Sequence, residues 1–520
     1  MSTFFGLEIA RHSLFVSQKA LDVTGHNISN ANTEGYTRQS LMLAAANPPY
    51  HTGILTRSLS VRTGGGVMIQ ELRQIRDSFL DIQYRRENRY LQEWTVKSDV
   101  VRYIEDIFSE PSETGLNASL GEFFNSLQEL SKYPESMEIR TLVRQEAQKL
   151  TETIHHQRSQ LLELQRQQDV SIEITVSEIN DIAVSIRDLN LQIHKFEIGG
   201  EYANDLRDKR NLLVDKLSGL IDFSYNETEN GGFRIDINGF PLVDHGEINL
   251  LMVERSQSNP VDMGTLNKVV WKDTGHDVVI KGGKMKGYMD MRDGASPDNM
   301  GIPYFIDQLD KFTKALVQEF NSVHQQGYSI PYGGSPSENG HGFFSFDGFS
   351  EPAGWDTMTP EERSQYILDN VNAKNICLDD RILESIYNIA TSSEYIEPDN
   401  AVKWGNNLNA LALAGIRNKK DIEITVNSNA IGIGNLEDFS KKVVADLAVE
   451  ASHAARITES QFLLTVSIDN RKQSVSAVSL DEEMSNMIRY QHSYSASARM
   501  ITVIDQLLET LIKGTGVVGR

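Results

Sequence analysis

The sequence is poor in cysteine and has no long apolar run. Its 520 residues include one cysteine, Cys377, so no disulfide can form within the chain. Such chains are usual in the cytosol, and they equally suit a protein that is exported before it folds. No stretch approaches 18 apolar residues, and the start Met1–Gly6 lacks the basic and apolar segments of a signal peptide. We therefore expect neither a membrane-spanning helix nor a cleaved signal.

Proline is absent from three long stretches: before Pro48, between Pro134 and Pro241, and after Pro398. Because proline interrupts helices, long helices are confined to such stretches. In the second stretch, isoleucines recur every seven residues, at Ile172, Ile179, Ile186 and Ile193. Apolar spacing of this kind predicts helices at 135–222, at about 303–325, and from about 436 to the end.

Strand signals are confined to the middle of the chain. Phe233–Ile237 alternates apolar and polar residues, and Asn238-Gly239 follows as a hairpin turn signal. More short strands are expected near 250, 270 and 280, and another at Ile422–Val426. The predicted fold class is mainly α with β insertions (α+β), in an elongated multi-domain chain. The predicted domains are a terminal coiled coil (1–40 with 475–520), a helical rod (41–225 with 285–328 and 431–474), a strand-rich outer domain (226–284) and a mixed insertion (329–430).

Both ends of the chain carry the spacing of coiled-coil seams. Small residues follow each N-terminal seam residue by three positions and would permit close helix approach. The predicted seam residues are Leu7, Leu14, Leu21 and Ile28 at the N-terminus, and Leu480, Met484, Met487, Gln491, Tyr494, Ala498, Ile501, Asp505, Leu508 and Ile512 at the C-terminus; all but Leu480, Asp505 and Ile512 are candidate assembly residues. We expect the two ends to meet and to need further copies, because a lone pair buries only one side of each helix. A plain antiparallel hairpin that caps a globular domain is an equal alternative.

A polar turn motif, Asn27–Tyr36, closes the first predicted helix. Gly35 would permit a positive φ there, and Asn30 and Asn32 can satisfy turn amides. We count Asn30, Asn32, Gly35 and Tyr36 among the candidate assembly residues. An ordinary helix C-cap is the alternative interpretation of this turn.

The charge is strongly negative and unevenly placed. The formal net charge is −22, which argues against nucleic acid as a partner. Residues 1–50 are neutral and residues 471–520 carry +1, so the middle of the chain carries −23. Neutral ends suit close self-packing, and an acidic middle suits a solvated exterior.

No catalytic motif is present. A Walker loop, a zincin helix and a nucleophile elbow are all missing, and Gly432-Ile433-Gly434 lacks the third glycine of a dinucleotide loop. Asp379-Asp380 is better explained as a helix start than as an acid–base pair. We therefore predict no enzyme activity, no cofactor and no metal site.

Several stretches together resemble the bacterial flagellar axial proteins. They are residues 4–39, Arg76–Leu80 with Tyr84–Arg86, Ala203–Arg210, Gly282–Gly287, Phe320–Tyr328 and Leu480–Arg499. The terminal stretches are shared by rod, hook and junction proteins, whereas the middle ones resemble the family of flagellar hook-associated protein 1, the hook–filament junction proteins. The likeness covers most of the chain and is weakest at 329–430. One departure is Asp208-Lys209-Arg210, after which the family pattern has a second acidic residue.

This resemblance implies a structural adaptor between hook and filament that assembles through its terminal helices. The implied partners are further copies in a ring or helical lattice, the hook protein, the second junction protein and an export chaperone, with no nucleic acid and no membrane. Export through the flagellar type III channel without a cleaved signal, to the extracellular flagellum, is also implied. The alternatives are another axial protein (second junction protein or flagellin), an extracellular adhesin that binds through 329–430, and an enzyme embedded in the middle domains.

Overall fold

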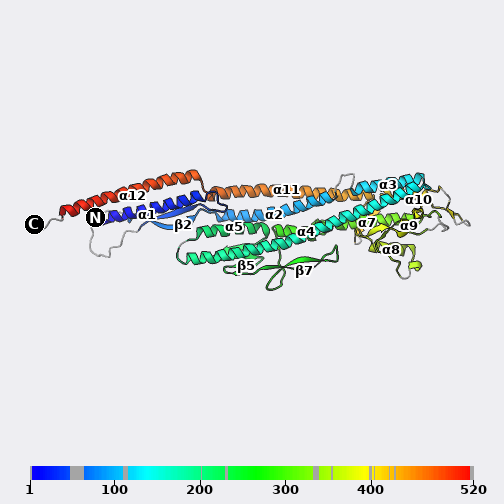
Figure 1. The fold of residues 1–520 in the computed structure, drawn as a ribbon, viewed down its shortest axis with the longest axis horizontal. Coiled ribbons are helices and arrows are strands. Elements are labelled where there is room, and N and C mark those ends of the chain that lie inside the picture. Colours follow the sequence, from blue (N-terminus) through cyan, green and yellow to red (C-terminus); the bar gives the residue numbers. More distant parts are fainter. Residues whose placement is uncertain are drawn as a thin grey trace.

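The protein is an elongated molecule whose two termini lie at the same end (Figure 1). The computed structural model describes residues 3–46, 64–108, 115–200, 202–228, 232–331, 339–352, 355–396, 401–402, 405–420, 422–426 and 429–515. Long helices dominate, and the strands form small antiparallel sheets, so the prediction of a mainly α fold with β insertions is confirmed. Parts of the predicted insertion 329–430 lie outside the described residues.

Most helices run along the long axis of the molecule (Figure 1). The helices are α1 Thr3–Ser29, α2 Ser78–Phe108, α3 Leu116–Lys132, α4 Met137–Glu197, α5 Asn204–Leu220, α6 Lys284–Asp293, α7 Ile302–His324, α8 Pro360–Asn370, α9 Asp380–Glu384, α10 Leu408–Gly415, α11 Leu436–Ser476 and α12 Leu480–Thr515. The strands are β1 Gln39–Ala45, β2 Val67–Gln74, β3 Ser224–Glu227, β4 Phe233–Ile237, β5 Phe240–Asp244, β6 Glu247–Ile248, β7 Leu251–Ser258, β8 Thr265–Trp271, β9 Phe344–Phe346, β10 Ile376–Leu378, β11 Tyr395–Ile396, β12 Ala401–Val402, β13 Ile422–Val426 and β14 Asn429–Gly434. Among the described residues, no helix is long and apolar enough to cross a membrane.

The body is built around α2, α4 and α11, with α4 as its longest helix. α4 starts at Ser136, whose hydroxyl accepts the Ile139 N–H. The isoleucine row predicted from seven-residue spacing is fully buried, because it faces α5 and the strands beside it. The chain leaves α4 at Gly200, which adopts a positive φ of 84°.

The strands of the middle region cover one side of α4 and α5. β3, β4, β5 and β6 form a four-stranded antiparallel sheet, and β7 pairs with β8. Asn238 and Gly239 have φ values of 49° and 90°, as the predicted tight hairpin turn requires. The strand expected near 280 is reduced to a single bridge between Val270 and Asp277. These strands share one apolar core with α4, α5 and α6, so they depend on the helices for burial.

The end of the molecule remote from the termini holds an aromatic core, here called the far core. It joins α3, α7 and β9 through rings that are at most 1% exposed, namely Phe123, Phe124, Phe320, Phe343 and Phe344. The buried Arg140 guanidinium donates to the Pro134 and Ile389 carbonyls at 2.8 Å each. Asp379 caps α9 by accepting the Arg381 N–H at 3.1 Å, which confirms its predicted place at a helix start.

Candidate assembly interface

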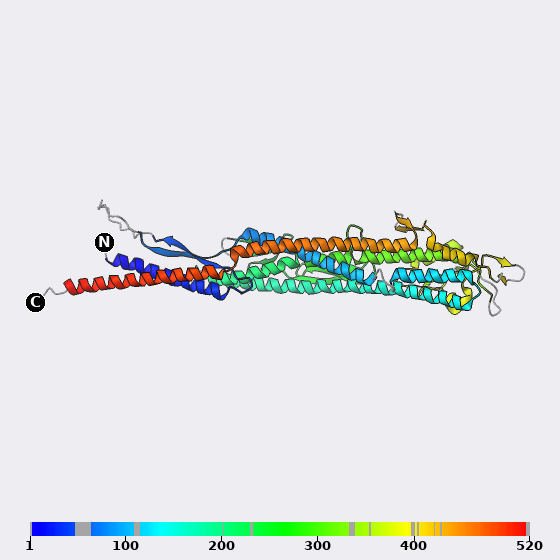
Figure 2. The ribbon, with the colours of Figure 1, turned by 90° about the horizontal axis from the view of Figure 1, so that it is seen from above.

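The terminal pair consists of α1 and α12, which lie side by side in opposite directions (Figures 1 and 2). Ser17 donates to Ser493 at 3.0 Å, and Ser497 donates to Ser13 at 2.9 Å. The prediction that the two ends of the chain meet is therefore confirmed. The β1–β2 hairpin accompanies the pair, and Figure 2 shows it diverging from the helices toward the N-terminal end.

Most buried positions of α1 hold small residues, with Val16 and Asn27 as the larger exceptions. Ala10, Ser17, Ala20 and Thr24 are buried, whereas the predicted seam residues Leu7, Leu14, Leu21 and Ile28 lie half-buried beside them. On α12 the predicted residues divide in the same way. Met487, Ala498, Ile501 and Leu508 are half-buried, and Met484, Gln491 and Tyr494 are exposed. Small residues allow the helix axes to approach closely, which leaves the larger side chains at the edges of the contact.

Large apolar side chains remain exposed along α12. We call these exposed side chains together the α12 apolar face, although they lie on more than one side of the helix; each is about half exposed or more, and they are Leu480, Met484, Ile488, Met500, Val503, Leu507, Leu511 and Ile512. Phe15 on α1 is also 54% exposed. The predicted seam contained Leu480, Met484 and Ile512 of this surface and missed the rest, because it followed a single row of residues. The signal that would have found the others is a helix with apolar residues on more than one face.

The turn after α1 is held by Asn27, which sequence reasoning did not single out as an assembly residue. Its buried amide donates to the Gln39 carbonyl at 2.9 Å and to the Glu483 carboxylate at 3.0 Å. Its oxygen accepts the Gln39 N–H at 3.0 Å and the Tyr36 hydroxyl at 2.8 Å. One side chain therefore joins α1, β1 and α12. The only sequence signal for it is its place at the start of the polar motif.

Three of the predicted turn residues have distinct places. Gly35 has a φ of 77°, as expected, and a Cβ there would lie 3.1 Å from the Leu212 Cβ. The Asn30 side chain donates to the His26 carbonyl at 3.0 Å, and its oxygen accepts from the Thr33 hydroxyl at 3.2 Å rather than from a turn N–H. The Thr33 N–H is satisfied instead by the Asn30 carbonyl at 2.9 Å. Asn32 is exposed.

Arg38 fastens the turn to the start of α12. Its guanidinium donates to Glu482 at 2.7 Å and to the buried Glu483 at 2.9 Å. The Arg38 N–H also donates to the Ser476 carbonyl at 2.9 Å, at the end of α11. Charge-assisted hydrogen bonds to a buried carboxylate are directional. These bonds therefore fix the position of the first turn of α12 relative to the end of α11.

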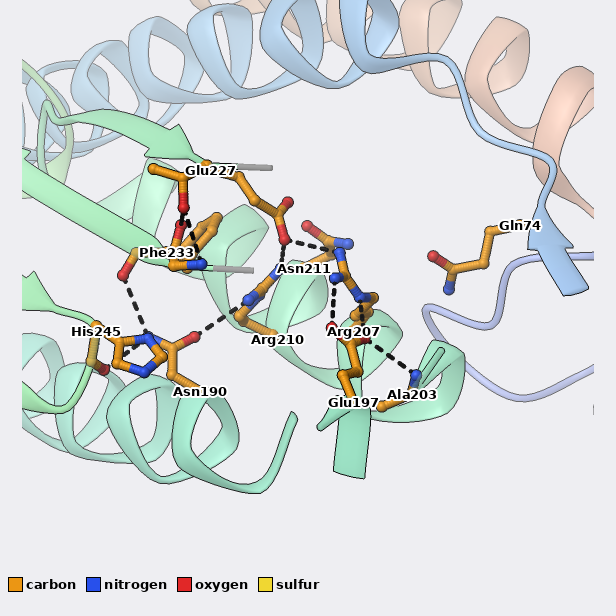
Figure 3. Close-up of polar contacts among 12 residues, drawn as sticks. Gln74, Asn190, Glu197, Ala203, Arg207, Arg210, Asn211, Glu227, Phe233 and His245 are labelled. Atoms are coloured by element: carbon orange, nitrogen blue, oxygen red, sulfur yellow. Dashed lines mark hydrogen bonds and ion pairs between the residues drawn. The ribbon is translucent and has the colours of Figure 1, made fainter. Parts of the chain in front are cut away.

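A polar cluster of the middle region lies between α4, α5 and the outer sheet (Figure 3). Arg207 forms two hydrogen bonds with Glu197, at 2.7 and 2.9 Å, and a third with Glu227 at 2.7 Å. Arg210 bonds Glu227 at 2.6 Å and lies over the Phe233 ring. Every charge here has an opposite partner, so the cluster ties elements together and offers no free reactive group.

The single cysteine is poorly suited to nucleophilic chemistry. Burial, together with the nearby carboxylates of Asp380, Asp347 and Asp379, raises the pKa of the Cys377 thiol to about 12. The thiol is therefore protonated at neutral pH, and the thiolate is the reactive form. Within the described residues, no group of three or more His, Cys, Asp or Glu side chains is placed to hold a metal ion.

Comparison with known proteins agrees with this architecture. Three family descriptions match: "Flagella basal body rod protein" at 9–37, "Flagellar hook-associated protein FlgK helical domain" at 101–344, and "Flagellar basal body rod FlgEFG protein C-terminal" at 473–513. Flagellar hook-associated protein 1 of Bacillus subtilis (strain 168) is 31% identical over the full length of both chains. The chain belongs to the flagellar hook-associated protein 1 family. It is therefore a structural hook–filament junction protein of the bacterial flagellum.

More distant members of the hook-associated protein 1 family also match along nearly the whole chain. Those of Salmonella typhimurium and Escherichia coli K12 are 23% and 22% identical, over 97% of this chain and 98% of theirs. A solved structure, the flagellar hook junction protein FlgK from Burkholderia pseudomallei, has a TM-score of 0.58 and 14% identity. The match covers 76% of this chain and all of the Burkholderia chain. This likeness supports the fold.

Proposed function

We propose that the protein assembles head to tail on the hook, through its terminal pair, into a ring or helical lattice. The observation that carries this proposal is the α12 apolar face, which a single subunit leaves exposed. Burying one such Leu, Ile or Met side chain contributes about 1.5–3 kcal/mol, so several buried together favour association strongly. The neutral charge of both ends keeps repulsion between copies small.

The proposal also assigns regions and partners. Residues 1–40 with 475–520 form the inner tube, the helical rod carries bending and torque, and 226–284 with 329–430 face outward. The hook protein lies on one side of the ring and the second junction protein on the other, and an export chaperone holds the chain before export. The proposal also includes export without a cleaved signal, a location outside the cell and the absence of catalysis. Family membership and the acidic middle region support it.

The test replaces two exposed residues of the α12 apolar face. We expect the double variant Leu507→Gln/Leu511→Gln to keep the circular dichroism and melting curve of the natural chain, because both side chains are exposed. We also expect it to lose incorporation into junctions when added to hooks that lack this protein, measured by electron microscopy and quantitative immunoblot.

The matched control replaces two exposed apolar residues of α4, Val170→Gln/Ile174→Gln. This variant removes similar area from the body and is expected to incorporate normally. Normal incorporation of the α12 variant would contradict assembly through this face. Deleting 1–30 or 485–520 extends the test, since the remaining body is expected to stay folded and to fail to assemble.

A further inference from the structure

The terminal pair and the body are joined without a shared apolar core. Neither apolar core cluster of the described residues includes a residue of α1, β1, β2 or α12. A cavity of about 560 Å³ separates the turn after α1 from the body, with Arg76, Tyr84, Leu212 and Lys472 among its lining residues. We call this region the hinge. Gly35 packs closely against Leu212 at one edge of this cavity, but the two parts share no apolar core, so polar contacts are well placed to set the angle between them.

The terminal side of the hinge presents three groups. Gln39 and Gln74 lie directly opposite each other in the β1–β2 ladder, so their side chains share one face of the hairpin. Both amides reach the first turns of α5, and the backbone N–H of Thr37 points to the same place. The hairpin therefore ends in a row of donors directed at one helix.

The α5 side of the hinge supplies the matching acceptors. Asp208 accepts the Thr37 N–H at 2.9 Å and the Gln74 amide at 2.8 Å, one on each carboxylate oxygen. Asp205 accepts the Gln39 amide at 2.8 Å. The Asn204 side-chain amide donates to the Leu72 backbone carbonyl at 3.1 Å. The Asn204 backbone carbonyl accepts from the Gln74 side-chain amide at 2.9 Å.

The opposite face of α5 is anchored in the body. Arg207 and Arg210, spaced three residues apart like Asp205 and Asp208, bond Glu227 at the edge of the outer sheet (Figure 3). Seven residues after Asp208, and so on the same face of α5, Asp215 bonds Arg85 of α2 and Lys472 of α11, at 2.6 Å each. The first turns of α5 therefore bind the terminal side of the hinge, while its opposite face and its later turns bind the body.

We propose that Asn204, Asp205 and Asp208 form a latch that fixes the angle between the terminal pair and the body. Asp208 is buried, and burial raises the pKa of its carboxyl to about 6. An apolar residue would avoid this desolvation, but it could not accept from Thr37 and Gln74 together. The Asp208 side chain therefore contributes more to the orientation of the terminal pair than to the free energy of folding. The latch belongs to the single subunit, so it goes beyond the proposed assembly and can be tested without it.

The test measures the hinge angle in the full-length, unassembled chain. Spin labels are placed at the exposed Gln18 on α1 and the exposed Gln192 on α4, in a Cys377→Ser background, and their distance distribution is recorded by pulsed electron resonance. Asp208→Asn replaces one acceptor oxygen with a donor, so one of the two contacts is lost. We expect the width of the distribution at least to double.

Gln74→Ala removes the Gln74 contacts with Asp208 and the Asn204 carbonyl from the terminal side, where a fold defect is not expected because the residue is half-buried in a hairpin. It should broaden the distribution similarly, and the double variant should be no broader than either single variant. The control is Asp188→Asn, which removes a charge from an exposed ion pair on α4. The proposal would be overturned if both latch variants gave distance distributions as narrow as that of the control. It would also be overturned if the broadening in the double variant were the sum of the two single effects. If Asp208→Asn does not fold, Gln74→Ala decides alone.

Discussion

The far core and the terminal pair are built from different residues. The far core buries large rings such as Phe123, Phe320 and Phe343, whereas the terminal pair buries small residues such as Ala10 and Ser17. Burial of a large ring stabilises a fold by several kcal/mol more than burial of an alanine. One chain can therefore stabilise the far core by itself, whereas the terminal pair keeps most of its large apolar side chains in contact with water.

Charge also distinguishes the ends of the chain from its middle. The ends of the chain are close to neutral, and the middle carries −23. Copies packed around a common axis through their ends would bring few like charges together, while the charged middle regions would face solvent. The exposed apolar side chains and the low net charge therefore both occur at the ends of the chain, where they favour packing between copies.

The largest expected effect is in the far core. Phe320→Ala removes a fully buried ring that touches Phe123, Phe124, Phe343 and Phe344, and should reduce the free energy of unfolding by about 3–5 kcal/mol. Urea unfolding followed by circular dichroism measures this loss. Phe15→Ala is the control on α1, and it should change the unfolding free energy by less than about 0.5 kcal/mol. Equal losses would remove the contrast between the two regions.

Protonation of one buried histidine, His324, should weaken the far core in acid. His324 is buried and neutral; its Nε2 accepts the Ala390 N–H at 2.9 Å, and its Nδ1 lies 2.8 Å from the His341 carbonyl. Burial, with a smaller effect of nearby Arg140, lowers the pKa of His324 to about 3 from an ordinary 6.5. The unfolded chain therefore binds this proton first, and stability is lost as pH falls below 6.5. Between pH 6.5 and 4.5 the loss is about 2–3 kcal/mol.

The measurement is urea unfolding at both pH values for the natural chain and for His324→Gln, which does not titrate. Asp208 and Asp379 have pKa values raised to about 6 by burial, so they act in the opposite sense over this range in both proteins. The difference between the two proteins isolates His324. An identical pH dependence would show that this histidine does not limit the far core in acid.

Local patterns in the sequence predicted much of the fold. Proline-free stretches located α1, α4, α11 and α12, and the Asn238-Gly239 pair located a hairpin turn. Seven-residue spacing identified the buried isoleucines of α4. These predictions succeed because backbone propensity and periodicity act between neighbours in the chain.

Contacts between distant segments were not predicted. The spacing of Leu7, Leu14, Leu21 and Ile28 indicated a seam, but did not show that the smaller residues beside it would face α12. Asn27 bonds Glu483 at a separation of 456 residues, and no spacing rule contains that pairing. Asp205 and Asp208 were recognised as a motif, but only the fold shows that they face the hinge.

A smaller effect is expected where the two terminal helices touch. Ser17→Leu places a large side chain in the close α1–α12 contact and should weaken the terminal pair by about 1–3 kcal/mol. Hydrogen exchange measures it: the amides of α1 and α12 should exchange faster, and those of α4 should not change. Gln18→Leu, at the neighbouring exposed position, is the control and should leave exchange unaltered. Faster exchange throughout the chain would show that the terminal pair and the body unfold together.

The smallest expected effect concerns the α12 apolar face in an isolated subunit. Leu507→Gln should change the exchange-derived stability of the terminal pair by less than about 0.5 kcal/mol, because the side chain is 59% exposed. Ile504→Gln is the matched variant, since Ile504 is half-buried where Gly6 of α1 approaches it, and should cost about 1 kcal/mol. A larger loss for Leu507 than for Ile504 would mean that the subunit already covers this face, and that the face is not free to receive a second copy.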